Sequence, residues 1–296
     1  ILSGGLLAPA LLFGGAGSFL GDVSEHSCVW TSPDSHELIA KNVIFKKQLT
    51  LPVKDWAEEH FTDGKAYYAD DSYKLAEKEF TTAISLDSDV AVYYAARGSS
   101  RHKLGQYLQA VGDFDNAIRL TPSVAEFYGL RGRSNYLREE YQSAMYDFEN
   151  ATLLAPNVAT YFADLGLAHY KLGNFELAIT EYDQAIKIAP EESEYYRMRG
   201  IAYRELSLYE KAMADLNKSI EIDPNRSLAY LSRGLTYHRQ DQYQLSIGDY
   251  DKALQLNPNE ARAAEGKGDA FRELGQPTNA NDAYATACKI DNAYCS

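Results

Sequence analysis

The sequence predicts an all-α solenoid of seven tandem helix pairs, preceded by an apolar segment. Three ladders of small residues carry this prediction, because each repeats at a fixed step of 34 residues. The first ladder is Gly64, Gly98, Gly132, Gly166, Gly200, Gly234 and Gly268. The second is Ala76, Ala110, Ala144, Ala178, Ala212, Ser246 and Ala280, and the third is Ala83, Ala117, Ala151, Ala185, Ser219, Ala253 and Ala287. Small residues in a fixed register indicate helices that approach one another closely at the same points of every unit.

Each unit is predicted to contain two amphipathic helices joined by a tight turn. In the unit 159–192, apolar residues recur at three- and four-residue spacing on both sides of Gly173. Gly173 supplies the turn, and a proline ends the second helix. That proline recurs in five units, as Pro122, Pro156, Pro190, Pro224 and Pro258. The seven predicted units are 57–90, 91–124, 125–158, 159–192, 193–226, 227–260 and 261–294.

This pattern is similar to that of the tetratricopeptide repeat (TPR) family. One unit supplies the family's small, aromatic and proline positions as Tyr94, Gly98, Gly105, Tyr107, Ala110, Phe114, Ala117 and Pro122. The resemblance covers residues 57–294 and implies a right-handed superhelical solenoid of helix-turn-helix units. Two kinds of departure occur. Ser88 and Asn292 replace the terminal proline in the outer units, and Arg101, Asn135 and His169 occupy one aromatic position.

The resemblance also implies a partner-binding site. In this family the first helices line a concave groove, and residues there usually carry ligand binding. By the family's register the groove includes Phe61, Tyr68, Leu130, Arg133, Tyr136, Leu167, Tyr170, Lys171, Arg197, Met198, Ile201, Arg204, Leu235, His238 and Arg239. Tyrosine and arginine are common anchors at protein interfaces. We expect a protein partner that offers an extended peptide or an amphipathic helix with some acidic residues. The alternative is that many of the tyrosines are packing residues of the repeat.

The composition disfavours several other functions. The formal net charge of −13 disfavours nucleic-acid binding, which needs a basic face. No nucleophile, zinc-protease, phosphate-loop or dinucleotide-binding motif occurs in a suitable context, so we expect no catalytic residues and no enzyme activity. The cysteines lack metal-ligand spacing, and no metal or cofactor is expected. Cys288 and Cys295 are a possible disulfide; the alternative is a small packing residue and a thiol in a frayed tail.

The N-terminal segment, residues 1–21, is apolar, and its first twenty residues carry no charge. Three interpretations compete: a membrane-embedded anchor, an arm that packs on another subunit, and a retained secretory signal or residues added by cloning. Acidic residues and no lysine or arginine follow until Lys41, so the repeats are expected on the non-cytoplasmic side of a membrane, in a periplasm, organelle lumen or exterior. Residues 22–56 lack the repeat and are predicted to form an irregular linker.

The sequence therefore favours a non-catalytic protein–protein interaction scaffold. The leading hypothesis is an accessory subunit or assembly factor of a larger membrane-associated complex, with membrane contact through residues 1–20. One alternative is a soluble exported adaptor or carrier that binds a peptide or small ligand in the groove. Another is the targeting subunit of an enzyme whose catalytic domain is on a separate chain.

Overall fold

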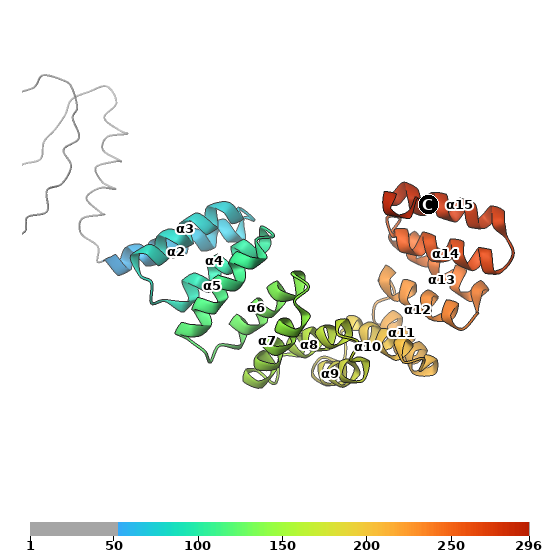
Figure 1. Ribbon diagram of the computed structural model, residues 1–296, viewed down its shortest axis with the longest axis horizontal. Helices are drawn as coiled ribbons and strands as arrows, with labels where there is room; N and C mark the ends of the chain where they lie inside the picture. The colour runs from blue at the N-terminus through green and yellow to red at the C-terminus, as the bar shows by residue number, and fades with distance from the viewer. Residues whose placement is uncertain (1–52, 296) are drawn as a thin grey trace, which may run out of the picture. The chain divides into compact units, whose positions relative to one another are not determined.

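The computed structural model describes residues 53–295, which form a tandem array of α-helices without a β-strand (Figure 1). The all-α solenoid prediction is thereby confirmed for the repeats. The predicted apolar segment 1–21 lies outside the described residues, as does the predicted linker up to residue 52. Among residues 53–295, no helix combines the length and the apolar character needed to cross a membrane.

The helices come in pairs, and each pair consists of a first and a second helix. The first helices are α2 (Val53–Ala69), α4 (Ala91–Lys103), α6 (Ala125–Leu137), α8 (Ala159–Lys171), α10 (Ser193–Glu205), α12 (Ser227–Arg239) and α14 (Ala261–Glu273). The second helices are α3 (Tyr73–Leu86), α5 (Tyr107–Leu120), α7 (Tyr141–Leu154), α9 (Phe175–Ile188), α11 (Tyr209–Ile222), α13 (Tyr243–Leu256) and α15 (Pro277–Ile290), which is followed by a short 3₁₀ turn, η1 (Asn292–Tyr294). Each second helix packs on its own first helix, and those before α15 also contact the first helix of the next pair.

The turn inside every pair holds one residue in the left-handed region. Gly173 adopts a φ of 80°, as the sequence predicts for a glycine at this point. Four pairs place a side-chain-bearing residue there, with φ between 56° and 62°: Asp71, Glu139, Ser207 and Asp241. The turns share one hydrogen bond, in which the N–H shortly past the helix end closes back on the helix; Asn174 donates to the His169 carbonyl at 2.9 Å. This closure holds the conformation even where glycine is absent.

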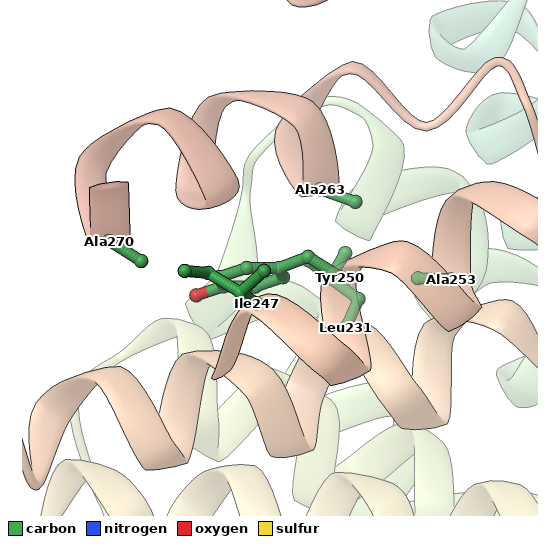
Figure 2. Close-up of a cluster of buried hydrophobic side chains, with 6 residues drawn as sticks. All are labelled: Leu231, Ile247, Tyr250, Ala253, Ala263 and Ala270. Carbon is green, nitrogen blue, oxygen red and sulfur yellow. The ribbon is translucent and has the colours of Figure 1, made fainter. Parts of the chain in front are cut away.

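The glycine ladder exists because a large side chain from the second helix lies directly against the first. A Cβ atom added to Gly132 would lie 2.7 Å from Cε1 of Phe148, which is closer than real Cβ contacts. The same place is taken in the other pairs by Phe80, Phe114, Tyr182, Leu216, Tyr250 and Tyr284. In Figure 2 the Tyr250 ring lies in a cluster with Leu231 and Ile247, facing Ala263 and Ala270 of α14. The core is thus a chain of small clusters, each shared by neighbouring pairs.

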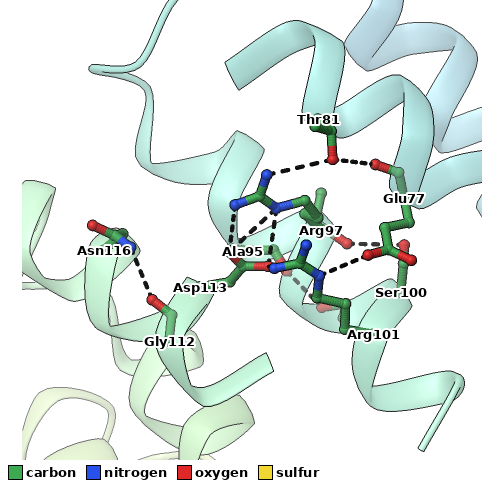
Figure 3. Close-up of polar contacts among 11 residues, drawn as sticks. Glu77, Thr81, Ala95, Arg97, Ser100, Arg101, Gly112, Asp113 and Asn116 are labelled. Atoms are coloured by element: carbon green, nitrogen blue, oxygen red, sulfur yellow. Dashed lines mark hydrogen bonds and ion pairs between the residues drawn. The ribbon is translucent and has the colours of Figure 1, made fainter. Parts of the chain in front are cut away.

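Polar contacts connect the pairs beside this core. Figure 3 shows Arg97 of α4, which donates from Nη2 to Oδ1 of Asp113 on α5 at 2.7 Å. Arg101 donates to the same carboxylate at 2.9 Å and to Glu77 on α3 at 2.8 Å. One buried carboxylate is therefore held by two guanidinium groups, and both of these also contact α3 of the preceding pair.

Candidate protein-binding groove

The first helices form a continuous row along the array. Each contacts the first helix of the next pair, from α2 through to α14. Side chains on the exposed side of this row therefore form one surface to which several pairs contribute, and we call it the first-helix surface.

Two adjoining cavities lie in the middle of the first-helix surface. The α6 cavity has a volume of about 210 Å³ and is lined by His102, Arg133, Tyr136, Leu137, Phe148, Asp164 and Leu167. The α8 cavity has a volume of about 270 Å³ and is lined by Arg133, Thr160, Ala163, Asp164, Leu167, Tyr182, Glu194, Tyr195 and Met198. The two share Arg133, Asp164 and Leu167. A single extended segment of a partner can thus contact both.

An ion pair forms the shared wall between the cavities. Arg133 on α6 donates from Nε to Oδ2 of Asp164 on α8 at 2.8 Å. Burial raises the pKa of Asp164, and the nearby Arg133 guanidinium opposes that rise. The ion pair joins α6 to α8 at the boundary between the two cavities.

The deepest residue of the α8 cavity is Tyr182 from the second helix α9. Its side chain is fully buried against Gly166, and its hydroxyl has no hydrogen-bond partner within residues 53–295. Burial raises the pKa of Tyr182 well above its ordinary value of 10.0. The hydroxyl is therefore a neutral donor whose buried, unsatisfied state costs free energy.

Comparison with known proteins agrees with this architecture. Tetratricopeptide repeat family models match residues 95–159 and 163–227, and a further repeat matches 227–260. The chain belongs to the tetratricopeptide repeat family. No curated protein sequence matches it.

Solved TPR structures share the fold at low sequence identity. A TPR protein from Parabacteroides merdae ATCC 43184 superposes with a TM-score of 0.70 at 14% identity, over 80% of this chain and 94% of that one. YrrB, described as a TPR protein with an unusual peptide-binding site, gives 0.52 at 23% identity, over 64% and 97%. The Cut9–Hcn1 hetero-tetramer of the APC/C gives 0.62 at 18%, over 79% and 45%. At these identities the likeness shows the fold alone; membership of the tetratricopeptide repeat family supports a protein-interaction scaffold.

Four of the predicted groove residues line the two cavities of this TPR array: Arg133, Tyr136, Leu167 and Met198. Others lie elsewhere on or beneath the first-helix surface. Phe61 packs on Phe80 and Tyr93, with ring centroids 5.7 and 4.8 Å away, and Leu235 packs against the cluster of Figure 2. Leu130 and Ile201 are half-buried. The cavities thus bring together only the central part of the predicted set.

Aromatic residues at one position of the TPR unit are shared between packing and the surface. Each contacts the ring five residues later, with centroids 5.2–5.4 Å apart. The pairs are Tyr68–Tyr73, His102–Tyr107, Tyr136–Tyr141, Tyr170–Phe175 and His238–Tyr243. One edge of each ring therefore stabilises its own turn, as the packing alternative expects, and Tyr136 also lines the α6 cavity.

The groove residues predicted from the sequence include basic side chains and no acidic one. Five predicted groove residues are basic: Arg133, Lys171, Arg197, Arg204 and Arg239. The nearby acids are already bound. Glu194 binds Arg197 at 2.5 Å and also Arg226. Glu205 binds Arg204 at 2.8 Å, approaches Arg239 at 3.9 Å, and accepts from the Tyr170 hydroxyl at 3.5 Å. Lys171 and Arg239 are exposed, which leaves positive charge available to a partner in a chain of net charge −13.

Sequence reasoning missed the acidic and deep members of the site. Asp164 occupies the register of Leu130 and Met198, which both belong to the predicted groove, so the register itself could have found it. Tyr182 belongs to a second helix, and its contact with the α8 cavity depends on the depth of its ring against Gly166. No sequence signal gives that depth.

The C-terminal cysteines form a disulfide in the structure. Cys288 near the end of α15 and Cys295 after η1 have Cα atoms 4.6 Å apart, within the usual range for a bridged pair. The bond ties the last turn of the chain to α15. In residues 53–295 no cluster of three or more histidine, cysteine or acidic side chains is arranged to bind a metal ion.

Proposed function

We propose that this protein is a non-catalytic adaptor that binds a segment of a partner protein across α6, α8 and α10. The observation that supports the proposal is the pair of adjoining cavities on the first-helix surface, which share Arg133, Asp164 and Leu167. Two neighbouring cavities with a polar wall between them suit a segment that inserts successive side chains on either side of an ion pair.

The lining supports a specific partner chemistry. Tyr136, Leu137, Phe148 and Leu167 give the α6 cavity an apolar wall, which suits a leucine-sized or aromatic side chain. Lys171 and Arg239, further along the surface, suit an acidic side chain on the same segment. The peptide-binding site of YrrB and the multi-subunit assembly that contains Cut9 are precedents from the same fold.

A peptide selection tests this proposal directly. Peptides selected from a displayed random library on the full chain would be synthesised and titrated by fluorescence anisotropy. Leu167→Glu places a charge in the shared wall and should weaken binding by about tenfold or more. Leu245→Glu, on the exposed side of α13, is the matched control and should leave affinity unchanged. Equal affinity for both variants would refute the groove.

We further propose that the adaptor serves as an accessory subunit or assembly factor of a membrane-associated complex. The apolar sequence of residues 1–20 supports this extension. Deleting residues 1–20 should release the protein from membranes or from its complex and leave its helical circular dichroism intact. Absence of the undeleted protein from membranes would favour the soluble exported adaptor, and membrane retention unchanged by the deletion would favour an enzyme-targeting subunit that is held by other contacts.

A further inference from the structure

Neighbouring TPR units are joined by a basic side chain at one register position, which we call the junction cation. It extends from a first helix to the second helix of its own unit and to that of the preceding unit. Arg131 on α6 binds Asp147 on α7 at 2.5 Å and Asp115 on α5 at 2.6 Å. Arg199 on α10 binds Asp215 at 2.7 Å and Asp183 at 2.5 Å. Each guanidinium therefore bridges two carboxylates from successive second helices.

Three more junctions within residues 53–295 keep a cation with one carboxylate. Arg97 binds Asp113 and also donates to the Thr81 hydroxyl at 3.4 Å (Figure 3). Arg233 binds Asp249 at 2.7 Å and the Asn217 side chain at 2.7 Å. Lys267 binds Asp251 at 2.6 Å. The bridge is thus a regular feature of the array, and its partners vary.

The junction formed by α7, α8 and α9 has no such cation. Leu165 occupies the position, and it is buried with Ala144, Phe148 and Ala168. Both carboxylate positions remain acidic, as Glu149 on α7 and Glu181 on α9. No ion pair joins either of them to a basic side chain in the described chain. Burial raises the pKa of Glu181, and the neighbouring negative charge of Glu149 raises it further.

A buried histidine beside these carboxylates also lacks a partner. His169 is 6% exposed, and its Nδ1 forms no hydrogen bond within residues 53–295. Its register position is that of Arg101 and Asn135, which donate to the equivalent junction carboxylates at 2.9 and 3.1 Å. Burial lowers the pKa of His169, and Glu149 is near enough to oppose that shift. A neutral histidine here offers an acceptor where the equivalent residues are donors.

We propose that the Glu149, Glu181 and His169 cluster binds the guanidinium group of an arginine from a partner protein. The guanidinium would donate to both carboxylates, as Arg131 and Arg199 do at the flanking junctions, and to Nδ1 of His169. A planar guanidinium group with several N–H donors matches two carboxylates and an imidazole nitrogen better than an ammonium group does. The cluster lies between second helices, so the arginine approaches a different surface from the segment in the groove.

The test uses N-acetyl-arginine amide as the probe, with N-acetyl-citrulline amide as its neutral, similarly shaped control. Methyl NMR of the full chain, labelled at leucine and alanine, reports the site through Leu165 and Ala168. The arginine probe should shift these signals saturably, and the citrulline probe should not. The double variant Glu149→Gln with Glu181→Gln should weaken binding by about tenfold or more. Glu176→Gln, an exposed change on α9, is the matched control and should bind as the parent does.

A second variant keeps the test decisive if the glutamine changes disturb folding. Leu165→Arg would supply the junction cation from within the chain and should abolish binding of the arginine probe while retaining helical content. The proposal is overturned if citrulline shifts the signals equally, if the double glutamine variant binds unchanged, or if the arginine probe gives no saturable shift.

Discussion

The close approach of glycine and ring predicts a sharp contrast between two glycine-to-alanine substitutions. A Cβ at Gly132 would lie 2.7, 2.9 and 3.0 Å from three atoms of the Phe148 ring. Phe148 is 1% exposed, so the ring has little freedom to move aside. Gly112, in the middle of α5, has no heavy atom within 4 Å of the same added Cβ. Both glycines are helical, but Gly132 is buried and Gly112 is exposed, so the added methyl group meets a ring in one case and open space in the other.

Two opposing effects determine how much each substitution changes the free energy of unfolding. Replacing glycine by alanine inside a helix stabilises it by about 1 kcal/mol. Overpacking a well-filled core costs about 1–3 kcal/mol. Gly112→Ala should therefore raise the free energy of unfolding by about 1 kcal/mol, whereas Gly132→Ala should lower it by up to about 2 kcal/mol.

Urea denaturation followed by circular dichroism measures both variants. Because a repeat array can unfold in segments, hydrogen exchange at α6 and α7 should accompany the urea titration of Gly132→Ala. Reduced protection confined to those helices and their neighbours is the expected result. If Gly132→Ala were as stable as Gly112→Ala, the packing explanation of the glycine ladder would be wrong.

Three further predictions concern single side chains. Glu139→Gly should stabilise the array by about 1 kcal/mol in denaturant titrations, because Glu139 is strained at a φ of 62°. Asp147→Asn should destabilise the array by about 2 kcal/mol, because the 2%-exposed Asp147 side chain pairs with Arg131. After the substitution, Asp115 is the carboxylate that still pairs with Arg131. Glu181→Gln should stabilise the protein at pH 7 and much less near pH 4. The reason is that burial and Glu149 raise the folded-state pKa of Glu181 above its usual 4.5. Protonation of Glu181 therefore favours the folded state at low pH, and this contribution is lost as pH rises through the folded-state pKa. Equal stabilisation at both pH values would contradict this assignment.

Much of the fold was predictable because the same packing constraint recurs in every repeat unit. Each ladder glycine lies against a bulky side chain, so the chain has few residue types to choose from at that position. The turns were less predictable. Gly173 signals its turn, but Glu139 and Ser207 adopt the same left-handed conformation because backbone hydrogen bonds and the packing of both helices hold them there.

The departures from the aromatic pattern have a physical reason that the sequence did not reveal. Arg101 and Asn135 each donate to a junction carboxylate, so those units use a polar contact where an aromatic ring is typical. The candidate site shows the same limit. Register predicted Tyr136 and Leu167, whereas the involvement of Tyr182 depends on a depth that only three-dimensional packing defines.

Site-specific photocrosslinking tests the central claim most directly. A photoreactive p-benzoylphenylalanine would replace Leu167 on the first-helix surface in one sample and Leu245, which is exposed on α13, in another, with the full chain expressed in its source cells. The account predicts a discrete crosslinked protein at position 167 and none at position 245, with the crosslinked residue lying in an acidic, leucine- or aromatic-containing segment of the partner. Crosslinking at position 245 alone, or to the same partner with equal yield at both positions, would contradict a binding surface on the first helices.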